Sequence, residues 1–131
     1  IIERTYQSGY GSYGNIVRIF DAIIDDKTTN ILMGAISLVG KTAESGVLEA
    51  ELGYWLGVDY WGAGLVTEAG KRIIQLGFDE LGLQRIHARR LSHNPASGRV
   101  LEKIGLVHIG QREGMCGDKF GAIEHYELLK T

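Results

Sequence analysis

Residues 51–70 read ELGYWLGVDYWGAGLVTEAG. Apolar and polar side chains alternate over residues 47–56, which predicts a strand with one buried face. Glycines interrupt the pattern over residues 57–64 and predict a loop. Beyond the loop, apolar side chains recur at helical spacing, at Val66, Ala69, Ile73 and Leu76. The stretch is therefore a strand, a glycine-rich loop and a helix in succession.

Toward the C-terminus, the sequence predicts another strand, a short helix and two final strands. Residues 83–91 form the strand, so residues 47–91 make a strand–helix–strand unit with a parallel crossover. The short helix has clear ends, because Asn94 is a good N-cap, Pro95 suits the first helical position and Gly105 suits the position after the helix. The final strands are residues 106–112 and 120–129.

Toward the N-terminus, the sequence predicts a hairpin. Residues 17–25 and 31–39 are its strands, and residues 25–30 are its turn. Residues 1–16 have the composition of a helix end followed by a loop. We therefore expect one α/β domain over residues 1–131, with a mixed, twisted sheet and flanking helices.

Composition limits the classes of function. The 131 residues include 16 acidic and 14 basic side chains, a formal charge of −2, which argues against a broad nucleic-acid or anionic-membrane surface. The single cysteine excludes an internal disulfide framework and a cysteine-based zinc site. The uncharged residues 31–40 are too few to span a bilayer. We expect a cytoplasmic protein that binds no metal, nucleic acid or membrane.

Two glycine motifs resemble nucleotide-binding loops but lack residues that those loops require. A P-loop ending at Gly40 needs a glycine at position 35, where Ala35 stands. The loop at Gly62 resembles a dinucleotide fingerprint, but Thr67 stands where that fingerprint needs Gly or Ala. No acidic residue follows at the distance that ribose recognition requires. The P-loop is therefore rejected, and the dinucleotide fingerprint is a poor fit.

The glycine loop can nevertheless bind an anion. Its two glycines let the backbone curl, and the free N–H groups of residues 63–66 point out of a helix N-terminus, which suits a pyrophosphate. A tight turn without a ligand explains the loop equally well. Asn94 is likewise explained by its capping role alone, although Asn94 and Ser97 together can also bind a polar ligand beside the first site.

Three strings, in order, carry a family resemblance. They are AELGYWL at residues 50–56, YWGAGLVTEA at residues 60–69, and N-x-x-S-x-x-VLEKIGL at residues 94–106. Together they resemble the GNAT superfamily of N-acetyltransferases, and most closely its RimJ/RimL-like branch, over residues 17–131. The resemblance implies an acyl-CoA N-acyltransferase fold with acetyl-CoA as the co-substrate.

The resemblance also implies which residues hold acetyl-CoA. The glycine loop and helix start would hold the pyrophosphate, the strand before them would pair its backbone with the pantetheine arm, and the second motif would contact the far side of that arm. In this order, the residues are Gly62, Ala63, Gly64, Leu65 and Val66; Trp55, Leu56 and Val58; and Asn94 and Ser97.

Two positions depart from the family pattern. Asp59 stands where many members carry Gln or Arg, so pyrophosphate binding must depend on backbone amides. Leu101 stands where many members carry a Tyr that protonates the departing thiolate. Solvent and Ser97 are the remaining candidates for that acid.

The implied reaction is direct attack of a neutral amine on the thioester, which needs a base and an oxyanion donor. Glu51 lies on the polar face of its strand and is predicted to take the proton through water, with Glu49 as the second candidate. The backbone N–H of Leu56 is the predicted oxyanion donor. The alternative explanation of both carboxylates is that they are solvated strand residues without a catalytic role.

The other reactive side chains are expected to be solvated or structural: His87, His93, His108, His125 and Cys116. The aromatic side chains are expected to fill the core or to floor an acceptor pocket, with the core preferred: Tyr54, Trp55 and Trp61.

We predict an acetyl-CoA-dependent N-acetyltransferase whose acceptor is a primary amine, either a protein N-terminus or a small molecule. The alternatives are a catalytically silent CoA-binding or regulatory protein and, less favoured, a nucleotide-binding dehydrogenase domain. A homodimer is left open. Since the sequence begins at Ile1, we expect residues upstream of it, and a domain lacking the family's N-terminal strand and helices.

Overall fold

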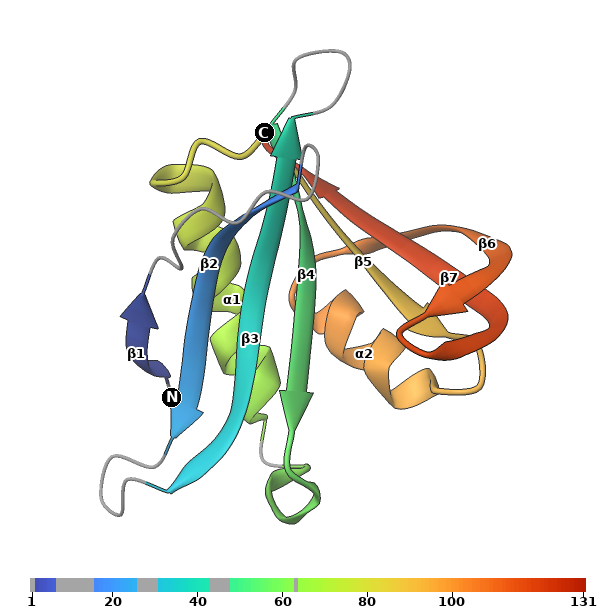
Figure 1. Cartoon of the computed structure of the whole chain (residues 1–131), viewed down its shortest axis with the longest axis horizontal. Coiled ribbons are helices and arrows are strands. Elements are labelled where there is room, and N and C mark those ends of the chain that lie inside the picture. Colours follow the sequence, from blue (N-terminus) through green and yellow to red (C-terminus); the bar gives the residue numbers. More distant parts are fainter. Residues whose placement is uncertain (1, 7–15, 26–30, 43–47, 63) are drawn as a thin grey trace.

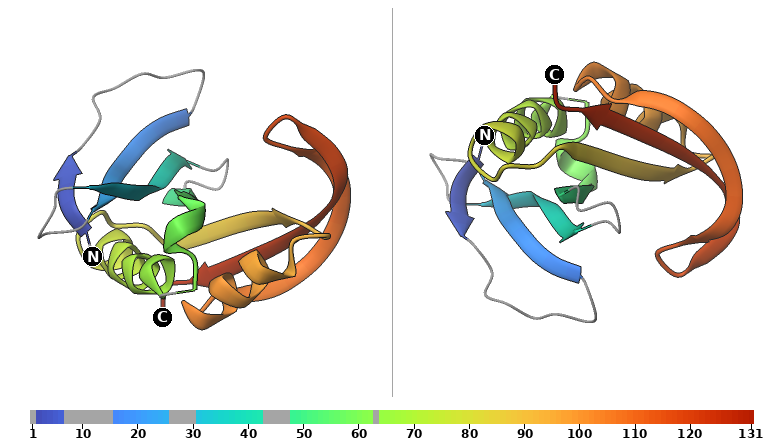
Figure 2. Two further views of the ribbon diagram at one scale, coloured as in Figure 1. Left: turned by 90° about the horizontal axis from the view of Figure 1, so that it is seen from below. Right: turned by 90° about the horizontal axis from the view of Figure 1, so that it is seen from above.

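The protein forms one mixed seven-stranded sheet with both α-helices on the same face (Figures 1 and 2). The computed structural model describes residues 2–6, 16–25, 31–42, 48–62 and 64–131. The strands, in sheet order, are β1 (Ile2–Tyr6), β2 (Ile16–Asp25), β3 (Leu32–Thr42), β4 (Leu48–Leu56), β5 (Arg85–Leu91), β7 (Lys119–Leu129) and β6 (Val107–Cys116). The helices are the 3-10 turn η1 (Val58–Tyr60), α1 (Leu65–Asp79) and α2 (Pro95–Lys103).

The centre of the sheet holds a parallel pair of strands. β4 and β5 are parallel and joined by α1, as the crossover prediction required, whereas the other neighbouring strands are antiparallel. Their ladder has three pairs, from Glu49 opposite Arg85 to Glu51 opposite His87, and the two strands then diverge (Figure 1). We call the opening beyond this last pair the fork.

The core lies between the sheet and the two helices. Ala50 and Leu52, alternate residues of β4, are buried against the helices. Ala69 and Ile73 of α1 are buried against the sheet. Burying each large aliphatic side chain contributes roughly 1.5–3 kcal/mol. Among the described residues, no helix has both the length and the apolar composition needed to cross a membrane.

The segment at the N-terminus was predicted wrongly. Ile2–Tyr6 is not a helix end but strand β1, which pairs antiparallel with β2 from Ile2 opposite Ile24 to Tyr6 opposite Asp21. Local composition could not predict this, because a short edge strand is selected by its partner strand rather than by its own pattern. The loop expected at residues 7–15 and the turn expected at residues 26–30 lie outside the described residues.

Helix α2 packs closely against the sheet at one glycine. Gly98 is buried, and a Cβ placed there would lie 2.5 Å from Arg90 Nε and 2.8 Å from Tyr126 Oη. Arg90 cannot easily move, because it donates to the Tyr126 hydroxyl at 3.0 Å and to the carbonyls of Leu91 and Ser92, each at 3.2 Å. The absence of a side chain at Gly98 therefore sets how near α2 lies to β5.

Replacing Gly98 with Ala is expected to destabilise the protein. Alanine would favour an isolated helix by about 1 kcal/mol, but overpacking against the held Arg90 guanidinium costs about 1–3 kcal/mol. Urea unfolding should give a lower midpoint for Gly98→Ala than for the wild type. Arg99→Ala, on the exposed side of the same helix, is the matched control, and an unchanged midpoint in Gly98→Ala would contradict the packing argument.

Candidate active site

The fork leaves backbone groups of β4 facing the space from which β5 has departed. Gly57 N–H donates to the Met33 carbonyl at 2.8 Å, so the odd-numbered residues of β4 direct their backbone groups toward β3. Because successive residues of a strand alternate in this direction, the backbone groups of Tyr54 and Leu56 face the fork. The sequence predicted that Trp55, Leu56 and Val58 pair their backbone with the ligand. In the structure, Trp55 pairs with Ala35 of β3, and Val58 begins η1.

The peptide after Leu56 is held at both ends. The indole Nε1 of Trp61 donates to the Leu56 carbonyl at 2.8 Å, and the Gly57 N–H of the same peptide donates to Met33. The 3-10 turn η1 supports this arrangement through Tyr60 N–H, which donates to the Gly57 carbonyl at 2.9 Å. Sequence reasoning missed this role of Trp61, since nothing in the pattern indicates that its indole folds back on the preceding strand.

Helix α1 begins at the fork with a glycine-based turn. Gly62 and Gly64 have positive φ angles of 84° and 73°, and Gly64 is the N-cap. Glycine is needed here for its backbone conformation, because a Cβ at either position would meet nothing within 4 Å. The first-turn amides of Leu65 and Val66 have no acceptor within the helix. They make this end able to bind an anion. Ala63 lies outside the described residues.

Helix α2 begins on the other side of the fork. Asn94 caps it as predicted, since Ser97 N–H donates to Asn94 Oδ1 at 3.4 Å. The Ser97 hydroxyl lies 2.6 Å from the Tyr54 hydroxyl, and this hydrogen bond joins α2 to β4. Tyr54 is half-buried, and burial raises the pKa of its phenol, an effect that the Ser97 hydrogen bond opposes. Tyr54 thus belongs to the fork rather than only to the core.

Leu101 lies on the buried face of α2. It is 1% exposed and packs in the hydrophobic core, so this position of α2 offers no proton donor to the fork.

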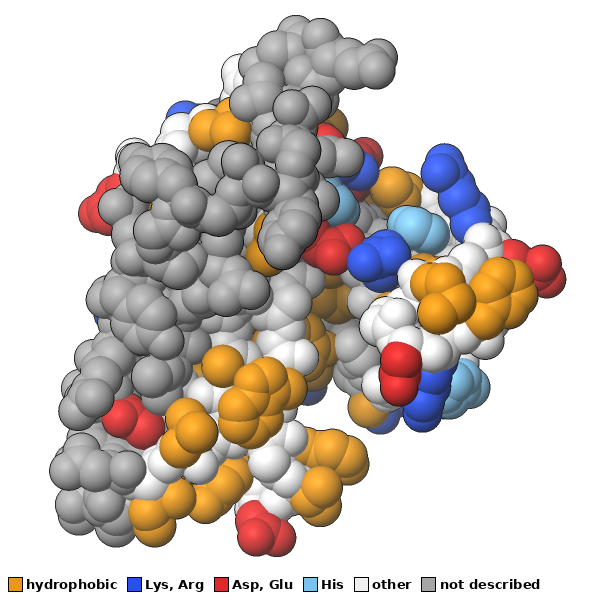
Figure 3. Space-filling model, in the orientation of Figure 1, with side chains coloured by type: hydrophobic (Ala, Val, Ile, Leu, Met, Phe, Trp, Pro, Cys, Tyr) orange, Lys and Arg blue, Asp and Glu red, His pale blue; other side chains and the backbone are white. Residues whose placement is uncertain are grey.

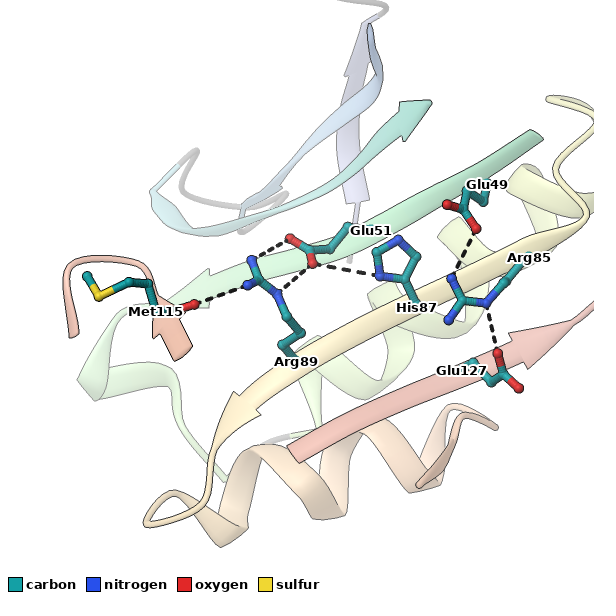
Figure 4. Close-up of polar contacts among 7 residues, drawn as sticks. All are labelled: Glu49, Glu51, Arg85, His87, Arg89, Met115 and Glu127. Atoms are coloured by element: carbon teal, nitrogen blue, oxygen red, sulfur yellow. Dashed lines mark hydrogen bonds and ion pairs between the residues drawn. The ribbon is translucent and has the colours of Figure 1, made fainter. Parts of the chain in front are cut away.

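A cluster of charged side chains lies on the face of the sheet opposite the helices (Figure 4). Arg89 holds both carboxylate oxygens of Glu51, with Nε to Oε2 at 2.7 Å and Nη2 to Oε1 at 3.1 Å. His87 Nδ1 is 3.7 Å from Glu51 Oε2, and Arg89 also donates to the Met115 carbonyl at 3.1 Å. Glu51 therefore sits at the last ladder pair before the fork, partly exposed and oriented by an arginine.

The second predicted carboxylate lies deeper in the same cluster. Arg85 bridges Glu49 at 3.0 Å and Glu127 at 2.8 Å, which ties β4 to β7 through β5. The Glu49 side chain is 12% exposed, compared with 35% for Glu51. Of the two, Glu51 is therefore more accessible to water and nearer to the fork.

Hydrophobic side chains gather beyond the charged cluster, over the end of β4 and η1 (Figure 3). Trp55, Val58 and Trp61 are 54%, 70% and 67% exposed. The preferred expectation that both tryptophans fill the core was therefore wrong. Because Trp61 has to reach the Leu56 carbonyl at the sheet edge, its ring stays at the surface.

The remaining histidines and the cysteine lie on the strands and the turn around the charged cluster and the start of α2. His108 Nε2 contacts Glu124 Oε1 at 2.9 Å, and His93 is exposed just before α2. The pKa of His125 is lowered by burial and by the nearby Arg112 and Arg89. Cys116 is a free, half-buried thiol at the end of β6. The described residues contain no group of three or more His, Cys, Asp or Glu side chains that could hold a metal ion.

A buried carboxylate anchors the segment that leads into α2. Glu124 of β7 is 8% exposed and accepts hydrogen bonds from the Ser92 hydroxyl and from Gln111 Nε2, the latter at 2.7 Å. The hydrogen bonds from Ser92, Gln111 and His108, in that order, lower the pKa of Glu124 from 4.5 to about 2. The ionised carboxylate is thus the form that the folded protein stabilises.

Acid should weaken the fold through Glu124. A carboxylate whose folded pKa lies below its unfolded value contributes stability that is complete above the unfolded pKa. This contribution should therefore be present above pH 4.5 and lost as the pH falls toward 2. Urea midpoints measured across this range should fall less steeply in Glu124→Gln than in wild type. Glu102→Gln, on the exposed side of α2, is the control, and parallel slopes for all three proteins would contradict the assignment.

Comparison with known proteins is consistent with this geometry. The family described as acetyltransferase (GNAT) domain matches residues 2–107. "Putative ribosomal N-acetyltransferase YdaF" of Bacillus subtilis is 33% identical over 84 residues, which are 63% of this chain and 46% of that protein. "Uncharacterized N-acetyltransferase p20" of Bacillus licheniformis is 34% identical over 92 residues, 70% of this chain and 48% of that protein. The chain spans about half the length of these curated relatives.

Solved structures share the fold. A GNAT-family acetyltransferase of Bacillus anthracis is 28% identical, with a TM-score of 0.71 over 83% of this chain and 65% of its own. The ribosomal-protein-S5-alanine acetyltransferase of Vibrio fischeri is 21% identical, with a TM-score of 0.74 over 84% of this chain and 61% of its own. The family resemblance and the fold class expected from the sequence are both confirmed.

Proposed function

Because the chain belongs to the GNAT acetyltransferase family, we propose that it carries an N-acetyltransferase site that moves an acetyl group from acetyl-CoA to a primary amine. The observation that carries the proposal is the fork, where a glycine-based helix N-terminus, the free edge of β4 and the start of α2 converge. Ligands of open α/β sheets bind at the carboxyl ends of parallel strands, where the connections part.

In this proposal, acetyl-CoA is held mainly by backbone groups. The turn at Gly62 and Gly64 and the amides of Leu65 and Val66 take the pyrophosphate, since helix N-termini favour anions. Ala63 remains part of this loop as a sequence prediction. The fork-facing edge of β4, at Tyr54 and Leu56, pairs with the amides of the pantetheine arm, in preference to Trp55 and Val58.

The second helix completes the proposed binding site. Ser97 and, behind it, the capping Asn94 border the pantetheine arm from the α2 side. The Leu56 N–H remains the proposed oxyanion donor, because it faces the fork and the peptide that follows it is held by Trp61 and Met33. A donor held in place costs little reorganisation when negative charge develops on the thioester oxygen.

Glu51 remains the proposed base. Its carboxylate is at the mouth of the fork and is partly exposed, so a water molecule can carry a proton to it from the attacking amine. Arg89 restricts the carboxylate to one orientation through two hydrogen bonds.

A catalytically silent CoA-binding protein is the alternative, favoured by the buried Leu101 and by Asp59. We expect calorimetry to detect CoA binding, and acetyl-CoA to release free thiol when an amine is added. The panel of amines contains peptides with free N-termini, amino acids and polyamines. Binding without thiol release for every amine supports the silent protein, whereas equal binding of NAD would overturn the assignment to CoA.

Replacing Glu51 with Gln tests the base. General-base catalysis contributes about 10²–10⁴-fold to rates, so Glu51→Gln should lower kcat at neutral pH by about 10²-fold or more. Glu49→Gln tests the second candidate, and Glu127→Gln, at the far end of the same charged cluster, is the matched control. If Glu51→Gln retains the wild-type rate, Glu51 is not the base.

A further inference from the structure

Three side-chain positions of β4 face the side of the sheet that the helices leave uncovered (Figure 2). The Tyr54 ring packs with the core, and its hydroxyl reaches α2 on the helix face. Glu51, Gly53 and Trp55 alternate with the helix-facing residues and point to the open face. They are therefore the positions of β4 that border the route of an acceptor from the open face to the edge of the strand.

Trp55 presents a large apolar ring to solvent on this face. Its side chain is 54% exposed, and its backbone is fixed by the antiparallel pairing with Ala35 of β3. The next residue is Leu56, whose N–H is the proposed oxyanion donor. The indole thus borders the proposed position of the acetyl group. An apolar group that binds there would remove its own surface and that of the ring from water.

Gly53, between Glu51 and Trp55 on this face, has no side chain. Among the described residues, a Cβ at Gly53 would meet only Ser37 Oγ, at an ordinary contact distance of 3.6 Å. Two residues of strand separate Gly53 from Glu51 and from Trp55, about 7 Å in each direction. An amine above Gly53 therefore has the carboxylate on one side and the indole on the other, with room for water toward Glu51.

The carboxylates on the open face are already paired with arginines (Figure 4). Arg89 donates to both carboxylate oxygens of Glu51, and Arg85 bridges Glu49 and Glu127. A carboxylate that is paired in this way has little net charge left to attract a further cation. An acceptor with several ammonium groups gains little from this cluster.

Positive charge continues onto the neighbouring strand. His125 of β7 lies opposite Arg89 in the ladder between β5 and β7. Its pKa is lowered by burial and then by the positive charges of Arg112 and Arg89. The second ammonium group of a polyamine would meet the same positive charges. The electrostatics beside Glu51 thus favour an acceptor with a single amine.

We propose that Trp55 selects the acceptor by packing its indole against the carbon skeleton that bears the amine, while the amine lies above Gly53 beside Glu51. The acceptors are then primary monoamines on an apolar or aromatic skeleton, and polyamines are poor substrates. Two sources share this chemistry, a small arylalkylamine and a peptide whose first residue is apolar. The inference depends on the acetyltransferase site proposed above and names its substrate class.

The wild-type protein should prefer apolar monoamines. We expect kcat/KM for 2-phenylethylamine to exceed that for spermidine and for ethanolamine by about tenfold or more. A tripeptide that begins with phenylalanine should likewise exceed one that begins with serine. The better substrate of the two apolar compounds then identifies the source, whereas a spermidine value equal to or above that of 2-phenylethylamine overturns the inference.

Replacing Trp55 with Ala should remove this preference. Trp55→Ala is expected to lower kcat/KM for 2-phenylethylamine by about 10–100-fold, with KM for acetyl-CoA changed by less than about threefold. Trp55→Phe retains an aromatic ring and should restore most of the value. Val107→Ala, which removes a 62% exposed apolar side chain from β6, is the matched control. An undiminished preference in Trp55→Ala overturns the inference.

Two further variants test where the amine lies and which charge matters. Gly53→Ala should fold, because its Cβ has room, and should raise KM for 2-phenylethylamine by about threefold or more. Urea unfolding checks that its stability is retained. Asp59→Asn removes an exposed carboxylate from η1 and should leave the rate with 2-phenylethylamine unchanged. If Asp59→Asn abolishes activity toward spermidine that the wild type possesses at a higher level, the acceptor is a polyamine and the inference is wrong.

A binding measurement separates this inference from the proposed function. Calorimetry of 2-phenylethylamine with the CoA-saturated protein needs no turnover. If the wild type releases thiol but Trp55→Ala keeps its preference, the substrate class is wrong and the acetyltransferase stands. If no amine releases thiol, the acetyltransferase is wrong. In that case weaker binding of 2-phenylethylamine to Trp55→Ala still supports the Trp55 contact, and equal binding overturns it.

Discussion

The early end of the parallel ladder between β4 and β5 is the constraint on which the rest of the site depends. After Glu51 and His87 the strands part, and the inner edge of β4 continues without a partner strand. Backbone N–H and C=O groups must find partners elsewhere when a ladder ends. The Leu56 carbonyl accepts a hydrogen bond from the Trp61 indole, and the Tyr54 hydroxyl is hydrogen-bonded to Ser97. The other backbone groups of that edge, above all its N–H groups, can form hydrogen bonds with the amides of a ligand.

Two polar networks hold the strands around this opening from opposite faces. On the face without helices, Arg85 and Arg89 connect β4 to β5 and to the carboxylates beside them. On the helix face, Glu124 gathers Ser92, Gln111 and His108 where β5 turns toward α2. Buried and partly buried charges are costly unless they are paired, so these groups favour one arrangement of the strands. Polar contacts on both faces of the sheet therefore hold the two strands in their diverging arrangement.

The sequence was most informative where local physics decides the structure. The glycine turn before α1, the Asn94 cap with Pro95 behind it, and the alternation along β4 were all predicted, because each depends on a few neighbouring residues. Strand β1 was missed because its partner strand decides it. The Tyr54–Ser97 bond and the exposed position of Trp61 were missed for the same reason. Such contacts join distant residues, and register rather than composition determines which backbone groups face the fork.

The position of Glu51 and Tyr54 on one strand has a chemical consequence. They are three residues apart, and successive side chains of a strand point to opposite faces, so Glu51 points to the open face and Tyr54 to the helices. Here the sheet separates them, and each has its own partner, Arg89 for Glu51 and Ser97 for Tyr54. In the proposed reaction, the amine thus loses its proton to Glu51 on the open face of β4, while the thioester lies at the edge of the strand.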